Sequence, residues 1–383
     1  MSLLFSSYTL NSPRGPLELV NRIVVAPMCQ YSAHNGEATD WHLMHWGNLL
    51  NSGAALFIIE ATGVTPEGRI TPACLGLWDD RTEAALKDKL SRARKLAPAI
   101  PVFIQLAHAG RKASSATPWE GGQLLSTEQG GWETLAPSAI PQLEGERLPH
   151  ELSKSELKQL IDDFVIAAKR AERIGLDGIE LHGAHGYLLH QFLSPIANQR
   201  KDEYGGSFEN RIRFPLELFA AVRAAYQGVL GIRISASDWI EGGWDLEQTT
   251  DFTRLLKQAG ADFVHVSSGG ISPQQKTPEV CFSSKLSVNA SCLTPPAQLI
   301  ASSIGRKPSN STVNCLIAFA ILSASCQCVF ATISLSKAIL TGSSPAFRQR
   351  FASDCFLGFF KLLNNFSSAT SGSKSSCSDT LPV

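Results

Sequence analysis

The chain has 383 residues, of which 34 are Lys or Arg and 34 are Asp or Glu, so its formal net charge at pH 7 is zero. Without an excess of either sign, no global electric field favours binding to nucleic acid or to an anionic membrane. The apolar content of 44% is enough for a sizeable core, and small molecules are therefore the expected partners. The first residues, Met1–Ser6, lack the basic region and sustained apolar stretch of a secretory signal, so we expect a cytoplasmic protein with reduced thiols.

Six short apolar segments alternate with amphipathic stretches between residues 23 and 276, which predicts repeated βα units and a parallel sheet. The predicted strands are Ile23–Met28, Ala55–Glu60, Val102–Leu106, Gly178–His182, Gly231–Ser235 and Phe263–Ser267. Each is brief and apolar, as in a sheet that is buried on both faces. A helix is predicted after Ser153, which forms a capping box with Glu156, and Ser207 is the predicted N-cap of another helix.

Parallel strands that are each followed by a helix fit either a closed eight-stranded barrel or an open doubly wound sheet, and periodicity alone does not choose between them. No G-x-G-x-x-G fingerprint follows the first strand, which argues against a dinucleotide-binding fold. Distinctive polar side chains instead lie at the carboxyl ends of several strands, where barrel enzymes build their active sites. The most prominent are Cys29, Tyr31, Gln105, His182, His185, Tyr187 and Arg233.

Several of these side chains also fit plainer interpretations. Cys29 could be a small buried hydrophobe, and Tyr31 a packing aromatic. Gln105 carries a donor and an acceptor that suit an alternating ligand edge, although glutamines are mostly exposed. The basic pair at 111–112 fits a solvated surface as well as it fits a site.

Arg233 stands within an otherwise apolar strand, where a buried cation needs a partner. An internal ion pair with Asp238 or Glu180 would satisfy this need. Alternatively, the guanidinium faces a ligand on which negative charge develops.

The imidazoles of His182 and His185 lie where the fourth strand gives way to its loop, so both could face one ligand. Two such donors on one carbonyl oxygen would draw electrons from a conjugated double bond, and Tyr187 could then protonate the α-carbon. A zinc site that adds His190 is a weaker alternative, because the H-E-x-x-H arrangement is absent. Purely structural histidines are the third interpretation.

The composition changes abruptly at Thr277. From there to the C-terminus the chain has 22 Ser, seven of its nine Cys, and no His, Tyr, Trp or Met. Our preferred interpretation is a shifted reading frame or a wrongly joined exon. A membrane anchor in the uncharged run from Pro308 to Ser336, which contains a weak apolar run over 313–335, is disfavoured by its Ser, Cys and Gln content. A disordered or cysteine-rich extension is the third interpretation, with Cys326 and Cys328 as weak metal ligands.

Four stretches together resemble the Old Yellow Enzyme family of FMN-dependent ene-reductases, in its cysteine-bearing, xenobiotic-reductase-like branch. They are Ala26–Tyr31 (APMCQY), Gln105–Gly110 (QLAHAG), Glu180–Tyr187 (ELHGAHGY) and Arg200–Phe214 (RKDEYGGSFENRIRF). The resemblance covers residues 3 to about 276. It implies a (β/α)8 TIM barrel that is incomplete here, with six βα units in an FMN-binding portion (1–276) and an unrelated tail (277–383).

The resemblance also implies an NADPH dehydrogenase that uses non-covalent FMN, with NADPH or NADH as reductant and an enone or enal as substrate. The residues that match the family's FMN contacts are Ala26, Pro27, Met28, Cys29, Ala61, Gln105 and Arg233. The matching catalytic residues are Cys29, which tunes the flavin, the substrate-binding pair His182 and His185, and the proton donor Tyr187. Tyr31 matches a second substrate ligand, and no metal is implied. An insertion from Trp119 to Ser138 resembles a substrate lid, and family members often form homodimers.

The tail departs from the family, which supplies its FMN-phosphate site from the last two βα units. Gly305-Arg306 resembles one element of that site, but no apolar strand precedes it, so we do not carry the role over. The alternative to a working oxidoreductase is therefore a catalytically dead or misassembled barrel fragment that does not retain FMN. A dienoyl-CoA-type reductase with an iron–sulfur cluster would need a compact four-cysteine signature, which the tail lacks.

Overall fold

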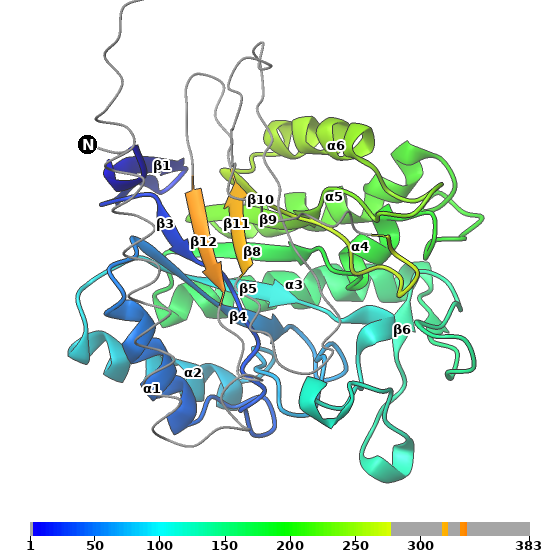
Figure 1. The fold of residues 1–383 in the computed structure, drawn as a ribbon, viewed down its shortest axis with the longest axis horizontal. Helices are drawn as coiled ribbons and strands as arrows, with labels where there is room; N and C mark the ends of the chain where they lie inside the picture. Colours follow the sequence, from blue (N-terminus) through cyan, green and yellow to red (C-terminus); the bar gives the residue numbers. More distant parts are fainter. Residues whose placement is uncertain (1–2, 277–315, 321–329, 335–383) are drawn as a thin grey trace, which may run out of the picture.

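The structure is a computed structural model that describes residues 3–276, 316–320 and 330–334, and an eight-stranded sheet forms its centre (Figure 1). Six parallel strands follow one another in this sheet in the order β10-β9-β8-β5-β4-β3. They are β3 (Ile23–Val25), β4 (Leu56–Gly63), β5 (Val102–Ala107), β8 (Gly178–Gly183), β9 (Val229–Ser235) and β10 (Phe263–Ser267). All six predicted strands are confirmed. β3 ends earlier than predicted, just before Pro27, which has no N–H to donate to a ladder.

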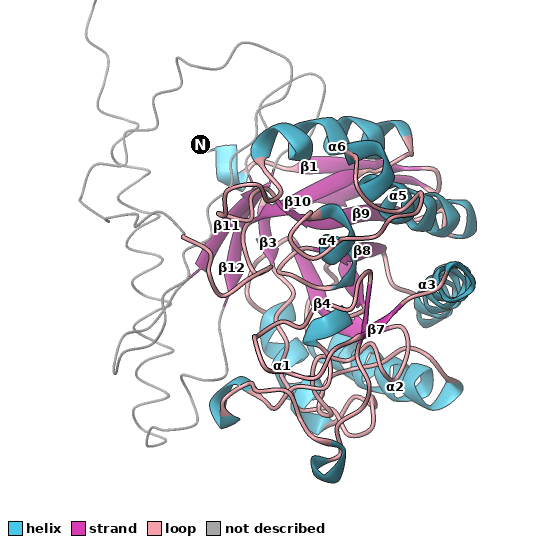
Figure 2. Cartoon of the chain, turned by 90° about the vertical axis from the view of Figure 1, so that its right-hand side faces the viewer, coloured by secondary structure: helices cyan, strands magenta, loops and turns pink. Residues whose placement is uncertain are grey.

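Helices cover the outer face of this sheet (Figures 1 and 2). They are α1 (Asp40–Leu50), α2 (Asp80–Leu96), α3 (Lys154–Ile174), α4 (Leu188–Leu193), α5 (Phe208–Ala225) and α6 (Leu246–Gln258). The predicted capping box starts α3, because Ser153 Oγ accepts from the Glu156 N–H at 3.3 Å and Glu156 Oε2 accepts from the Ser153 N–H at 2.7 Å. Ser207 is confirmed as the N-cap of α5, since its Oγ accepts from the Asn210 N–H at 3.4 Å.

An amino-terminal hairpin fills one end of the sheet's interior with apolar side chains. Its strands, β1 (Tyr8–Ser12) and β2 (Gly15–Leu19), are antiparallel and contribute Leu10 and Leu19. These leucines pack with Val24, Leu56, Ile58, Phe103 and Val229 of the parallel strands. Hydrophobic contacts therefore close this end of the barrel. The polar residues of the strands lie at the opposite, carboxyl end, where barrel enzymes build their sites.

The long connection between β5 and α3 holds the predicted insertion and several short elements. These are the 3-10 turns η2 (Gly110–Lys112), η3 (Pro118–Glu120) and η4 (Thr127–Gln129), and the paired strands β6 (Leu135–Ala136) and β7 (His150–Glu151). A further 3-10 turn, η1 (Leu3–Phe5), precedes the hairpin. The connection therefore has local structure close to the carboxyl end of β5.

Two strands from the serine-rich tail extend the same sheet, which our sequence analysis did not predict. β12 (Phe330–Ser334) pairs in parallel with β3, and β11 (Leu316–Ala320) is antiparallel to β12. β11 also contacts β10, so the two ends of the sheet meet (Figure 1). Apolar runs as short as these show no clear hydrophobic periodicity, so the sequence does not identify them as strands. They can nevertheless pair with the edge strand of a sheet, whose backbone N–H and C=O groups would otherwise lack partners.

The predicted fold class, an α/β barrel with only six βα units, is confirmed, because six parallel strands follow one another in the sheet. The described tail strands do not continue this βα pattern, since β11 is antiparallel to β12. The described residues of the run considered as a membrane anchor lie in β11 and β12. Across the described ranges, no helix is long and apolar enough to cross a membrane. The boundary at residue 276 and the origin of residues 277–383 in a frame error stay predictions.

Candidate active site

Polar residues of four strands lie in adjacent layers inside the barrel, and one of them, His265, was not predicted from the sequence. His182 on β8, Arg233 on β9 and His265 on β10 are register partners, and they form one layer. Gln105 on β5 and Glu180 on β8 are paired directly beneath them. Since paired residues of neighbouring strands point to the same face, these five side chains share one interior region.

Glu180 is completely buried and organises the lower layer. Its Oε1 accepts a hydrogen bond from Gln105 Nε2 at 2.7 Å, and its Oε2 lies 2.9 Å from His265 Nδ1. The carboxylate thereby fixes the Gln105 amide, whose Oε1 is left as an acceptor for a ligand. Sequence reasoning considered Glu180 only as a partner of Arg233 and missed this role, although a carboxylate in an apolar strand is itself a signal.

Arg233 does not form either ion pair that the sequence suggested. Its side chain is buried, and its Nε has no hydrogen-bond partner among the described residues. Glu180 is occupied by Gln105 and His265, while Asp238 accepts hydrogen bonds from Ser194 and from the Trp244 N–H. Burial lowers the pKa of Arg233, and the charge of Glu180 partly offsets this effect. A positive charge is thus available to a ligand at this position.

His182, His185 and Tyr187 are brought together at the carboxyl end of β8, as predicted. The His182 ring lies 5.3 Å from that of His185 and 4.8 Å from that of Tyr187, both in edge-to-face geometry. His182 Nδ1 accepts from the Ala184 N–H at 3.3 Å, so the proton of the neutral ring is on Nε2. Tyr187 is the N-cap residue of α4, and burial raises the pKa of its phenol.

His185 is held in an uncommon backbone conformation, with φ of 60°. Its N–H donates to Ser235 Oγ at 3.0 Å, and its Nε2 lies 2.7 Å from Ser267 Oγ. Burial, followed by the nearby charge of Arg233, moves the pKa values of both His182 and His185 well below their ordinary value. Both rings are therefore neutral at pH 7, and they can act as hydrogen-bond donors without carrying charge.

His190 belongs to a separate network. Its Nδ1 accepts from the Gly186 N–H at 2.8 Å, and its Nε2 lies 2.8 Å from the buried Asp238 Oδ1. Both ring nitrogens are thus engaged, which rules against the three-histidine zinc site. A search of residues 3–276 and the two tail strands finds no group of three or more His, Cys, Asp or Glu that could hold a metal ion.

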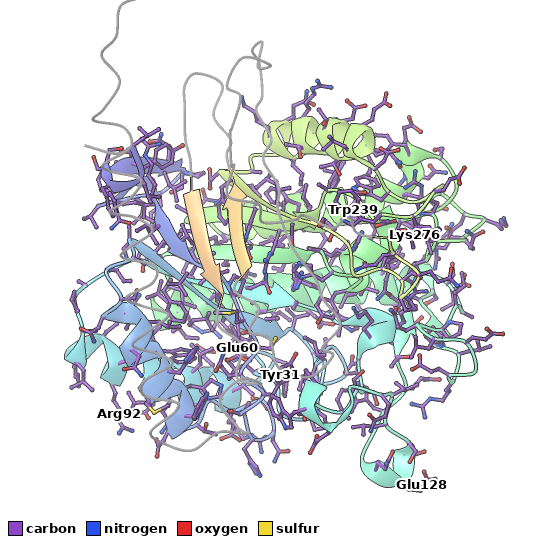
Figure 3. All side chains as sticks on the ribbon, in the orientation of Figure 1. Tyr31, Glu60, Arg92, Glu128, Trp239 and Lys276 are labelled. Carbon is purple, nitrogen blue, oxygen red and sulfur yellow. The ribbon has the colours of Figure 1, made fainter. Side chains whose placement is uncertain are left out.

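The segment Ala26–Tyr31 follows β3 and faces the same end of the barrel. The Gln30 N–H donates to the buried Glu60 Oε2 at 2.7 Å, which fixes the turn; the side chains of Tyr31 and Glu60 are labelled in Figure 3. Tyr31 has a positive φ of 49°, and its ring meets that of Trp119 edge to face at 5.6 Å. Burial raises the pKa of Tyr31, as do the nearby charges of Cys29 and Tyr187.

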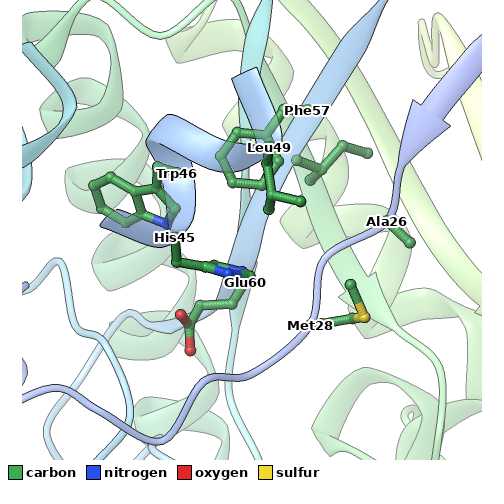
Figure 4. A pocket seen from close by; sticks show the side chains of 8 residues that line it. Ala26, Met28, His45, Trp46, Leu49, Phe57 and Glu60 are labelled. Carbon is green, nitrogen blue, oxygen red and sulfur yellow. The ribbon is translucent and has the colours of Figure 1, made fainter. Parts of the chain in front are cut away.

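A narrow hollow lies behind this segment (Figure 4). It is lined by Ala26, Met28, His45, Trp46, Leu49, Phe57, Ile58 and Glu60. Three of these residues are on α1, so the hollow belongs to the layer between helix and sheet. It is not part of the region that holds His182, Arg233 and Tyr187.

The interpretation of Arg111 and Lys112 as a solvated basic pair is wrong. Arg111 is buried and donates to the Ile271 carbonyl at 2.8 Å. Lys112 Nζ donates to the His185 carbonyl at 2.8 Å and lies 5.1 Å from the centre of the Tyr187 ring. Burial, reinforced by the charge of Arg111, lowers the pKa of Lys112 to about 8. Periodicity could not reveal this role, because the pair sits in a 3-10 turn.

Comparisons with known proteins agree with this arrangement. The sequence pattern of the NADH:flavin oxidoreductase / NADH oxidase family matches residues 13–290, somewhat beyond the break that we predicted at 276. An NADH:flavin oxidoreductase of Gibberella zeae is 47% identical over 270 residues, which are 66% of this chain and 65% of that protein. An NADPH dehydrogenase of Geobacillus thermodenitrificans is 42% identical over 274 residues, which are 71% of this chain and 74% of that protein. The chain thus spans just under two thirds of the Gibberella relative.

Two solved structures share the fold at higher identity than chance. Morphinone reductase superposes with a TM-score of 0.56 and 29% identity, over 69% of this chain and 71% of its own. An old yellow enzyme homologue from Zymomonas mobilis gives 0.59 and 26% identity, over 72% of this chain and 77% of its own. The family match over residues 13–290 includes the six βα units that carry the polar cluster.

Proposed function

Because the chain belongs to the NADH:flavin oxidoreductase / NADH oxidase family, and to its Old Yellow Enzyme type, we propose that it reduces the C=C bond of α,β-unsaturated ketones or aldehydes. FMN is the cofactor of this family, and when bound it would supply the hydride, after reduction by NADPH or NADH. The observation that carries the proposal is the buried Arg233, whose Nε has no hydrogen-bond partner in the described part of the chain, beside two neutral histidines and a protonated phenol.

The residues of this cluster fit a flavin ring. Gln105 presents an oriented amide oxygen, and Arg233 presents a positive charge that forms no ion pair with a carboxylate of the described residues. We propose that these two side chains hold the polar edge of FMN, together with Ala61 and the segment Ala26–Cys29. Arg233 would stabilise the negative charge that develops on reduction, which is commonly a large electrostatic contribution to catalysis.

The substrate side of the site would be formed by His182, His185 and Tyr31. The two neutral imidazoles would donate to the carbonyl oxygen of the enone and polarise its conjugated double bond. Tyr187 holds its proton at pH 7, since burial raises its pKa, and it would give that proton to the α-carbon. Trp119 contacts Tyr31, which supports our prediction that the insertion acts as a lid over the substrate.

Substitution of Tyr187 tests the proton-donor role. Tyr187→Phe should slow oxidation of the reduced enzyme by an enone by about 10²–10⁴, the usual contribution of a general acid, and should leave reduction by NADPH nearly unchanged. Tyr204→Phe is the matched control, because the Tyr204 hydroxyl donates a hydrogen bond to Glu217 of α5. An equal loss in both half-reactions would contradict the role.

The second candidate is a barrel fragment that does not retain FMN. It is favoured by β11 and β12, which complete the sheet between β3 and β10 as two strands antiparallel to each other and not as two further βα units. We propose that residues 1–276 form the FMN-binding portion and that 277–383 derive from a frame or splicing error. An in-frame transcript across codons 270–285 would overturn the origin of the tail in such an error.

For the oxidoreductase, we also propose a cytoplasmic location, a homodimer and a small-molecule substrate.

A further inference from the structure

The loop that carries His185 and Tyr187 is held through its backbone by buried side chains. The N–H of Gly186, which lies between these two residues, donates to His190 Nδ1 at 2.8 Å. The Gly186 carbonyl accepts from Gln191 Nε2 at 2.7 Å. His190 and Gln191 are both on α4 and are completely buried. The backbone of Gly186 is therefore fixed at both of its polar groups.

Asp238 in turn orients the His190 ring. Because Nδ1 accepts from Gly186, the proton of the neutral ring is on Nε2, which lies 2.8 Å from Asp238 Oδ1. The other carboxylate oxygen accepts from Ser194 Oγ at 2.6 Å and from the Trp244 N–H at 2.7 Å. Burial raises the pKa of Asp238, but His190 and these hydrogen bonds outweigh it, and the net pKa is lowered. The ionised carboxylate thus selects the tautomer of His190 that can accept from Gly186.

On its other side the loop rests against the segment that follows β10. Gly186 has a positive φ of 77°, and a Cβ atom there would lie 2.1 Å from the carbonyl oxygen of Gly270. A Cβ atom on Gly270 would in turn lie 2.5 Å from the backbone of His185. The two backbones therefore touch, and the bond to His190 keeps the loop in this contact.

We propose that His190, in the tautomer set by Asp238, is a positioning residue that places the Tyr187 phenol for proton transfer to the substrate. The inference rests on the proposed function, in which Tyr187 protonates the α-carbon. Both ring nitrogens of His190 are engaged, so it acts through the loop and not on the substrate. The Tyr187 ring lies 4.8 Å from that of His182, and a shift of its backbone would move the hydroxyl relative to this imidazole. A misplacement of about 1 Å near the reacting atoms can cost about 10² in rate.

Two substitutions separate the two hydrogen bonds of His190. The amide of His190→Gln reaches as far as Nε2 and can still donate to Asp238, but it has no acceptor in the place of Nδ1. His190→Asn puts an oxygen in the place of Nδ1 and can still accept from Gly186, but it does not reach Asp238. A purely structural role makes His190→Asn the more damaging change, since a buried carboxylate loses a donor. The positioning role makes His190→Gln the more damaging change for the chemistry.

The experiment measures oxidation of the reduced holoenzyme by an enone in stopped flow, beside unfolding in urea. We expect His190→Gln to slow this oxidation by about 10² and His190→Asn to recover most of the loss, although His190→Asn unfolds at the lower urea concentration. Added to Tyr187→Phe, His190→Gln should slow the reaction by no more than about twofold, because a residue that acts through another is not additive with it. His150→Asn is the matched control, since His150 is exposed and lies 2.9 Å from the Glu156 carboxylate. It should change neither quantity.

Hydrogen exchange of the Gly186 amide gives a readout that does not need FMN. Measured by NMR on the FMN-free full chain labelled with ¹⁵N-glycine, it should be slow in the wild type and in His190→Asn and faster in His190→Gln. Equal exchange in all three proteins, a slower oxidation in His190→Asn than in His190→Gln, or a further loss of about 10² on top of Tyr187→Phe would overturn the proposal. A wild type that binds no FMN, or that an enone does not reoxidise, would instead refute the proposed function, and flavin absorbance on the same samples distinguishes the two failures.

Discussion

The change Arg233→Met is expected to stabilise the protein without its cofactor and to weaken its affinity for FMN. Arg233 is 8% exposed, and its Nε has no hydrogen-bond partner in the described part of the chain, so the guanidinium is desolvated with little compensation. Replacing buried charges with apolar side chains of similar volume gains about 1–4 kcal/mol in favourable cases. We expect about 1 kcal/mol, the low end, because Glu180 would lose a neighbouring positive charge.

The loss in FMN binding should be larger than this gain. A hydrogen bond to a charged group contributes about 1.5–3 kcal/mol, which corresponds to a rise in Kd of roughly 10–150-fold. Thermal unfolding of the FMN-free protein gives the first quantity, with an expected rise in Tm of about 2 °C for a chain of this size. Fluorescence titration with FMN gives the second.

Arg254→Met is the control for this prediction. Arg254 is exposed on α6 and pairs with Asp251 in the same helix, so its loss should change stability by less than about 0.5 kcal/mol and should leave FMN binding unchanged. Destabilisation of the FMN-free Arg233→Met protein by more than 1 kcal/mol would show that Arg233 has a structural partner. An unchanged Kd would refute its role toward the cofactor.

Three further predictions concern single side chains. Burial lowers the pKa of Lys112 to about 8, so between about pH 8 and 10.5 the unfolded chain binds more protons than the folded one. The free energy of unfolding of the wild type should therefore rise with pH across that window relative to that of Lys112→Met. The same pH dependence of unfolding free energy in both proteins would contradict this. Trp119→Ala removes the contact with Tyr31 and should change KM for bulky enones more than for small ones, whereas an equal change for both would argue against a lid. Ser153→Ala should lower the free energy of unfolding by about 1 kcal/mol through loss of the α3 cap, measured in urea, and no change would show that the cap is dispensable.

The strands could be predicted from the sequence because each is a continuous apolar run bounded by polar residues, and this signal does not depend on tertiary context. The site residues could be predicted because parallel strands place their carboxyl ends at one end of the barrel, so polar residues at those ends are expected to meet. His182, His185 and Tyr187 meet because β8 ends between them and the loop turns through the positive φ of His185.

Other features depend on contacts between distant segments, which spacing does not reveal. Lys112 binds the carbonyl of His185, and Glu180 binds Gln105, and both pairs are more than 70 positions apart in the sequence. The pairing of β12 with β3 joins the two halves of the chain and follows from an exposed edge, not from any pattern in the tail. Sequence periodicity reports on local faces, so it found the strands but not these partners.

The visible absorption spectrum of the purified, desalted full chain tests the central claim most directly. If the chain retains FMN, the spectrum will show the two bands of oxidised flavin in a ratio close to one per chain, and an enone will reoxidise the cofactor after reduction by NADPH. A colourless protein that also fails to take up added FMN would contradict the proposed function. The cluster around Arg233 would then be an inherited arrangement in a chain that is not an enzyme.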